Sequence, residues 1–320
     1  MLHRPLPVPT PAEEREHHRL SAELAGLEVP DFVAPAHHHV VLRGMRFHYL
    51  DWGEAGRPPA LFLHGGGQTA RTWDLPCLSL RRDLHCLALD QRGHGDSEWS
   101  YAFEYSGDAH ASDVAALLDH LGVQRVVLIG MSMGCLNGLH FAARWPDRVA
   151  AFVAVDAGPW VLMEGGQRII DFVRDADGAA SLDAWVARAL RFNPRRDPRL
   201  LRRSLLHNLR ELPDGTLTWK TDRRRPLELE GMQAQLQNLR ALLSRIRCPT
   251  LILRGAESDV FLDEHAERFA GALPDAHWVR IDGAGHAIQG DQPLALVGEI
   301  RRFLGERGLT APRGRAAAVR

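Results

Sequence analysis

Residues 128–134, LIGMSMG, place one serine between two glycines directly after a short apolar run. The run at 125–130 has the length and composition of a buried strand, and the residues after Ser132 continue as a helix to Pro146. A tight turn between strand and helix holds such a serine in a strained conformation with its hydroxyl exposed. Gly130 and Gly134 fit this turn, because the two backbones approach too closely for a Cβ atom.

The same apolar pattern recurs on both sides of this stretch. A helical segment at 106–123 separates two of the runs and gathers its apolar residues on one face. Runs that are apolar throughout and alternate with helices are typical of a parallel sheet covered on both faces. The sequence therefore predicts an α/β fold. The expected strands lie at 38–44, 46–53, 60–66, 85–90, 125–130, 149–156, 249–255 and 277–282.

The alternation is interrupted between Pro159 and Arg247, where the chain is helical, rich in leucine and arginine, and has no convincing strand. This segment predicts a helical cap inserted into the sheet domain. We therefore divide the chain into an N-terminal extension (1–36) with a short helix, a core, a cap and a disordered tail. The core comprises 37–158 and 248–307, the cap 159–247 and the tail 308–320.

The composition is that of an ordinary globular protein. Hydrophobic residues make up 45%, charged residues 25%, and the formal net charge is −1, which favours neither nucleic acid nor an anionic membrane as a partner. The four cysteines are scattered, as expected for reduced thiols in the cytoplasm, and no secretory signal or membrane span is recognised. The run at 37–39, three histidines, is interpreted as the start of a strand, so no metal site is expected.

A serine hydroxyl needs a base to remove its proton. Among 17 histidines the best candidate is His286, which lies in a glycine-rich loop after the last expected strand. Gly283 and Gly285 allow this loop to fold back toward Ser132.

A carboxylate must in turn hold the imidazole in the correct tautomer. Asp259 is favoured, because it lies in the loop after the strand at 249–255. Glu257 shares that loop, and Asp156 ends the strand at 149–156, so both remain alternatives.

Donors for an oxyanion are expected in the segment FLHGGGQT, where glycines follow a buried strand. The N–H groups of Gly66 and Met133 are the expected pair, and Gly67 is a possible substitute for Gly66. The substrate pocket is expected to include Gly67, Met131 and Trp160. The other aromatic residues of the cap could line this pocket as well, but its core is the favoured place for them.

Together the segments LHGGGQTARTW, LDQRGHGDS, IGMSMG, LRGAESD and GAGHA resemble the successive motifs of the α/β-hydrolase superfamily, in its cap-bearing branch. The resemblance covers about residues 40–304. It implies an eight-stranded, mostly parallel sheet and a Ser–Asp–His site that needs no metal or organic cofactor. It also implies that Asp90, Arg92 and His94 are scaffold. Met131 departs from the histidine that many relatives carry before the nucleophile.

A serine nucleophile argues against dehalogenation and epoxide hydrolysis, which use a carboxylate in this superfamily. The expected function is hydrolysis of a small-molecule carboxylic ester or lactone through an acyl-enzyme on Ser132. Three alternatives remain open: a carbon–carbon bond hydrolase of ring-fission diketones, a cofactor-free perhydrolase, and a non-catalytic receptor. The oligomeric state is left open.

Overall fold

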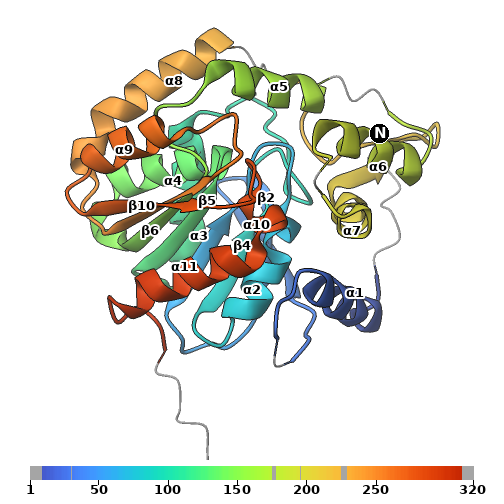
Figure 1. Ribbon diagram of the computed structural model, residues 1–320, viewed down its shortest axis with the longest axis horizontal. Helices are drawn as coiled ribbons and strands as arrows, with labels where there is room; N and C mark the ends of the chain where they lie inside the picture. Colours follow the sequence, from blue (N-terminus) through green and yellow to red (C-terminus); the bar gives the residue numbers. More distant parts are fainter. Residues whose placement is uncertain (1–8, 30, 175–177, 195, 225–228, 312–320) are drawn as a thin grey trace, which may run out of the picture.

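An eight-stranded sheet forms the centre of the molecule in the computed structural model, which describes residues 9–29, 31–174, 178–194, 196–224 and 229–311 (Figure 1). The strand order is β1-β2-β4-β3-β5-β6-β9-β10. Strand β2 is antiparallel to both of its neighbours. All the remaining pairs of neighbouring strands, from β4 to β10 in this order, are parallel. The predicted eight-stranded, mostly parallel sheet is therefore confirmed. Its strands are β1 (Ala36–Leu42), β2 (Met45–Asp51), β3 (Pro59–Leu63), β4 (His85–Leu89), β5 (Val126–Met131), β6 (Val149–Val155), β9 (Thr250–Gly255) and β10 (Ala276–Ile281).

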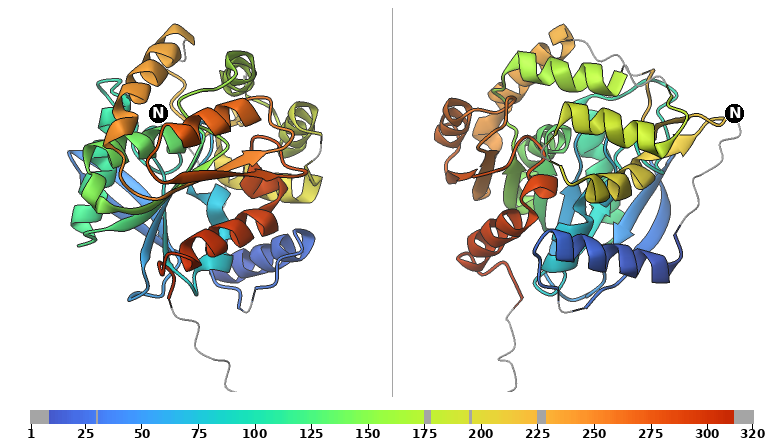
Figure 2. Two further views of the ribbon diagram at one scale, coloured as in Figure 1. Left: turned by 60° about the vertical axis from the view of Figure 1, so that its left-hand side comes forward. Right: turned by 45° about the vertical axis from the view of Figure 1, so that its right-hand side comes forward.

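Helices cover both faces of this sheet, and two separate cores lie between them and its strands. Successive side chains of a strand point to opposite faces, so Leu61 and Leu63 join one cluster while Ala60 and Phe62 join the other. The first cluster includes residues of α3, α4 and α9, and the second includes residues of α2 and α11 (Figures 1 and 2). These helices are α2 (Asp74–Leu80), α3 (Gly107–His120), α4 (Met133–Arg144), α9 (Asp263–Gly271) and α11 (Pro293–Gly305).

Between β6 and β9 the chain forms the predicted helical insertion, which carries a small core of its own. The indoles of Trp185 and Trp219 lie edge to face with their ring centroids 4.7 Å apart, and Trp185 donates a hydrogen bond to the Leu217 carbonyl. The insertion also contains a two-stranded antiparallel sheet, so the expectation that it has no strand was wrong. Three-residue strands carry too little periodicity to be recognised in a sequence. The elements are α5 (Met163–Arg174), α6 (Leu182–Phe192), α7 (Pro198–Asn208), β7 (Leu209–Glu211), β8 (Leu217–Trp219) and α8 (Leu229–Leu242).

The N-terminal extension contains one helix, α1 (Pro11–Leu24), which begins with a capping box between Thr10 and Glu13. Figures 1 and 2 show α1 beside α2 and α7, so it contacts both the core and the insertion. At the other end of the chain, the Ala311 N–H donates to the Asp83 carbonyl. Most of the tail expected at 308–320 lies outside the described residues. Within the described part of the chain, no helix combines the length and the apolar character that crossing a bilayer requires.

Candidate active site

Ser132 occupies the sharp turn between β5 and α4. Its backbone has φ 51° and ψ −119°, a left-handed conformation that side-chain-bearing residues rarely adopt and that costs about 1–3 kcal/mol. The neighbouring glycines make the turn possible. A Cβ on Gly130 would lie 2.5 Å from the Gly134 carbonyl oxygen, and one on Gly134 would lie 2.2 Å from the Leu63 carbonyl oxygen. The strained turn and the need for both glycines, predicted from the sequence, are present.

His286 forms its hydrogen bond with Asp156, the residue directly after β6. The Nδ1 atom of His286 lies 2.8 Å from Oδ2 of Asp156, whose side chain is fully buried, while His286 keeps 16% of its side chain exposed. A carboxylate at Nδ1 favours the tautomer in which Nε2 is the basic nitrogen. The structure therefore gives His286 the orienting carboxylate that a general base needs.

Asp156 is itself held by the last residue of β9 and by the loop that follows. The Gly255 N–H donates to Oδ1 over 2.7 Å, and the Ser258 hydroxyl donates to Oδ2. Burial raises the pKa of the Asp156 carboxyl, and the bonds from His286, Ser258 and Gly255 oppose that rise. Asp156 also has a positive φ of 49°, so two strained residues, Ser132 and Asp156, end neighbouring strands of the sheet.

The placement of Asp156 corrects the prediction that Asp259 orients His286. The side chain of Asp259 is 53% exposed and forms an ion pair with Arg168 of α5. Glu257, the third candidate, is an exposed residue whose N–H donates to the Ala284 carbonyl. Both carboxylates follow β9 in the chain, as the sequence indicated, but the structure brings the end of β6 to the imidazole.

The glycine loop after β3 lies against the serine turn. A Cβ on Gly65 would be 3.4 Å from the Ser132 Cβ and 2.5 Å from the Met131 sulfur. No acceptor for the Gly66 N–H is found within the part of the chain that the structure describes. Gly67 has a φ of +73°, and its Cβ would lie 2.9 Å from a methyl group of Val173 in α5. The loop is thus enclosed between the serine turn and the helical insertion.

Buried polar side chains fix this glycine loop, and their role was not predicted from the sequence. The Gln91 N–H donates to Nε2 of His64 over 3.0 Å, so Nδ1 of His64 carries the proton and donates to the Gly65 carbonyl over 2.8 Å. Burial lowers the pKa of His64, which keeps the ring neutral. Gln91 also donates to the His64 carbonyl and accepts from Asn137 of α4. The one sign of these contacts in the sequence is that a histidine, His64, stands directly before the glycines.

The segment from Asp90 to Ser97 has the scaffold role that the resemblance implied. The buried Asp90 carboxylate accepts from the N–H groups of Ala70 and Asp96 and from Nδ1 of His48. These contacts hold its pKa well below the usual range although burial opposes them. Arg92 forms a bidentate pair with Asp113, and His94 bonds to the Arg92 carbonyl.

Among the residues that the structure describes, one group of side chains has spacing compatible with a metal ion. Ligand atoms of His48, Asp90 and Asp96 lie within 4.8 Å of one another. All three groups already have protein partners, since His48 bonds to Asp90 and the Lys220 ammonium lies 2.9 Å from Asp96. The group is therefore accounted for as structural hydrogen bonding.

The residues predicted for the substrate pocket separate in space. Met131 and Gly67 border the glycine loop, as described above. Trp160 instead contacts the guanidinium groups of Arg240 and Arg268, which lie 5.4 and 4.7 Å from its ring centroid, and it lines a pocket beside α9. The structure therefore does not bring Trp160 to the serine turn. Trp185 and Trp219 are core of the insertion, as expected.

Comparisons with known proteins show the family of this chain. A model of the alpha/beta hydrolase family matches residues 60–299. Esterase Rv0045c of Mycobacterium tuberculosis is 32% identical over 274 residues, which cover 81% of this chain and 86% of that protein. A crystal structure of that esterase has a TM-score of 0.74 at 29% identity and covers 93% of this chain and 100% of its own. Lipase LipV of the same organism is 28% identical over 267 residues, 81% of this chain and 98% of that protein.

Proposed function

This chain belongs to the α/β hydrolase family and is a homologue of esterases, and from that premise we propose that it hydrolyses a small carboxylic ester or lactone through an acyl-enzyme on Ser132. Ser132, His286 and Asp156 are the proposed catalytic residues. The observation that carries the proposal is the 2.8 Å hydrogen bond from His286 to the buried Asp156 carboxylate.

In the first half of the reaction, the Ser132 oxygen attacks the carbonyl carbon of the ester while His286 Nε2 takes the hydroxyl proton. Asp156 stabilises the resulting imidazolium without accepting its proton. The negative charge on the former carbonyl oxygen is met by the N–H groups of Gly66 and Met133. Collapse of the tetrahedral intermediate transfers the proton from His286 to the leaving alcohol and leaves an ester on Ser132.

In the second half, His286 takes a proton from water, whose oxygen attacks the acyl carbon. The second tetrahedral intermediate releases the carboxylic acid and returns the proton to Ser132. The conformation of Ser132 favours this chemistry, because a hydroxyl on a strained turn at the N-terminus of α4 lies where backbone N–H groups stabilise negative charge.

A fluorophosphonate probe followed by peptide mass spectrometry tests the nucleophile. We expect one adduct, on Ser132, in the folded protein and none in Ser132→Ala. Folded protein without an adduct, or with an adduct on another serine, contradicts the proposal.

A panel of p-nitrophenyl esters, lactones and ring-fission diketones tests the reaction class. We expect turnover of short acyl esters, lactones or both, and the same panel with hydrogen peroxide measures any peracid formation. Turnover of diketones alone would assign a carbon–carbon bond hydrolase. Binding without turnover of any compound would assign a receptor.

A further inference from the structure

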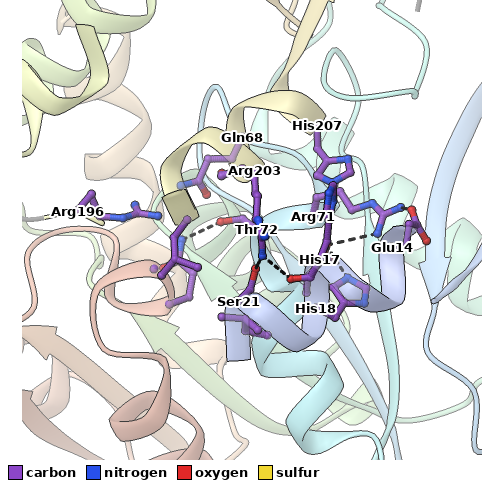
Figure 3. Close-up of a pocket in the computed structure, with 16 residues that line it drawn as sticks. Glu14, His17, His18, Ser21, Gln68, Arg71, Thr72, Arg196, Arg203 and His207 are labelled. Carbon is purple, nitrogen blue, oxygen red and sulfur yellow. Dashed lines mark hydrogen bonds and ion pairs between the residues drawn. The ribbon is translucent and has the colours of Figure 1, made fainter. Parts of the chain in front are cut away.

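A cavity of about 110 Å³ lies where the N-terminal extension, the core and the helical insertion meet (Figure 3). It is lined by α1, by the segment from Gln68 to Leu75, by α7 with the residues before it, and by α10 (Ile288–Asp291). In Figure 3 the labelled side chains of Arg203 and His207 come from α7, whereas those of His17 and Ser21 come from α1. Each of the three parts of the chain thus contributes a wall.

This cavity adjoins the proposed active site through two residues of its lining. Oε1 of Gln68 accepts a hydrogen bond from the N–H of Gly65, the residue that lies against Ser132. Gln289, three residues after His286, donates to the Thr72 hydroxyl over 3.1 Å. A group bound in the cavity is therefore separated from the glycine loop by one side chain.

The acidic residues of the lining are already paired. Glu14 forms an ion pair with Arg71. Asp74 forms ion pairs with Arg71 and with His18, and the nitrogen–oxygen distance in both of these is 3.3 Å. His18 also bonds to the Val33 carbonyl through its other ring nitrogen. Arg71 has two carboxylate partners, so its charge is balanced within the protein.

Arg203 lacks such a balance. One of its guanidinium nitrogens, Nη1, donates to the His17 carbonyl over 2.8 Å and to the Ser21 hydroxyl over 3.2 Å, and both acceptors are neutral. No carboxylate of the described residues pairs with it. Burial lowers the pKa of Arg203, and the carboxylate of Glu16, which forms no ion pair with it, opposes this only in part.

Arg196 is the second under-compensated cation of the lining. Its side chain is 18% exposed, and its Nε atom lies 3.5 Å from Asp291 without a hydrogen bond. Burial lowers its pKa too, although Asp291 opposes this. The guanidinium lies over α10, because a Cβ on Gly290 would be 2.7 Å from its central carbon.

Two neutral imidazoles complete the polar lining. The Nδ1 atom of His17 is buried without a hydrogen-bond partner in the described chain. Burial and the neighbouring Arg71 lower the pKa of His207 to about 4, so at neutral pH this ring offers a donor without adding charge. Two incompletely paired arginines and two neutral rings thus leave hydrogen-bond donors in the lining for a negatively charged group.

We propose that this cavity is an anion-binding subsite, which takes a carboxylate or phosphate group through Arg203 and Arg196. Arginine suits this task because its planar guanidinium presents several donors to such oxygens. The anion is either the distal group of the ester substrate, in which case the inference rests on the proposed esterase activity, or a free anion that occupies the cavity beside the active site.

The substrate source is tested by comparing p-nitrophenyl butyrate with the p-nitrophenyl monoesters of succinate, glutarate and adipate, whose carboxylates reach different distances. We expect Arg203→Gln to lose at least about tenfold more kcat/KM on the best anionic ester than on the butyrate. Arg203→Lys, which keeps the charge, should recover part of this loss. The matched control is Arg202→Gln, which removes an exposed arginine of the same helix and should leave both values unchanged.

Binding without turnover tests the free-anion source. Titration calorimetry with inorganic phosphate and with succinate should show binding to the wild-type protein and to Arg202→Gln, and at least about tenfold weaker binding to Arg203→Gln. Thermal unfolding of each variant establishes that it is folded.

The outcomes separate the two proposals. Anion binding together with an unchanged preference between esters supports the free-anion source, and a changed preference supports the substrate source. If folded wild-type protein binds neither anion and shows the same ester preference as Arg203→Gln, the subsite is refuted. Absence of both ester turnover and a fluorophosphonate adduct refutes the esterase proposal instead, and the calorimetry still decides whether the cavity binds anions.

Discussion

The ends of β6 and β9 each present an aspartate, and the two residues meet opposite environments. Asp156, after β6, is fully buried, accepts hydrogen bonds from the β9 loop and contacts His286. Asp259, in the loop after β9, is half exposed and pairs with Arg168 of the helical insertion. The β9 loop thus serves the imidazole indirectly, by placing donors around a carboxylate that another strand supplies. The comparison shows that an aspartate's position after a strand does not decide whether it can orient His286. The hydrogen-bond donors around its carboxylate do.

The largest effect should follow from Asp156→Asn. An amide at this position keeps the shape of the side chain but does not hold the imidazole in the productive tautomer, so kcat should fall by about 10⁴-fold. Stopped-flow or steady-state hydrolysis of p-nitrophenyl butyrate measures this. Activity within tenfold of the wild type would remove Asp156 from the proposed catalytic residues.

Gly255→Ala should have the next largest effect. The added Cβ would lie 2.2 Å from the Gly285 carbonyl oxygen, so the loop that carries His286 must move. A displacement of about 1 Å at a reacting group can reduce the rate by about 10²-fold, and we expect a loss of that order in kcat.

Gly271→Ala is the control for this substitution, because no atom lies within 4 Å of a Cβ added there. It should keep full activity. If both alanine variants are equally active, the β9 loop does not position His286 in the way inferred here.

Ser258→Ala removes one donor from the Asp156 carboxylate while leaving Gly255 and His286 in place. A hydrogen bond to a charged group is worth about 1.5–3 kcal/mol, so kcat should fall by about tenfold or more. The pH profile of kcat/KM should shift as well, because the loss of a donor raises the pKa of Asp156 further. An unchanged rate and profile would show that Ser258 only shapes the loop.

Asp259→Asn should have the smallest effect. An exposed ion pair contributes at most about 1 kcal/mol to stability, and we expect kcat to stay within about threefold of the wild type. Arg168→Gln should behave alike, since it removes the other half of the pair. A loss of several hundredfold in Asp259→Asn, with Asp156→Asn active, would reverse the comparison.

Prediction from the sequence succeeded where local pattern and chemistry coincide. The strained turn at Ser132 follows from two glycines and one serine between an apolar run and a helix, and the eight strands follow from apolar runs of the right length. The hairpin formed by β7 and β8 was missed because three-residue strands depend on their partners for definition. The prediction that Trp160 lines the substrate pocket failed because the sequence does not show which side of the insertion an aromatic residue faces.

The hydrogen bonds that hold the glycine loop could not be predicted from the sequence either. His64 precedes the glycines in the sequence, but its role depends on Gln91 and Asn137, which reach it from other segments. The cavity beside the site could be predicted even less, because its walls come from segments far apart in the chain. Its lining includes α1, more than 170 residues from α7 in the chain, as the Arg203–His17 contact shows.

The sequence by itself determined the fold class, the serine turn and the histidine loop, because each depends on residues that are neighbours in the chain. Only the tertiary structure decided between Asp156 and Asp259. Burial and hydrogen-bond donors, which set a carboxylate's role, come from whichever strands the sheet places side by side. Here β6 lies next to β9, so the Gly255 N–H and the Ser258 hydroxyl meet Asp156.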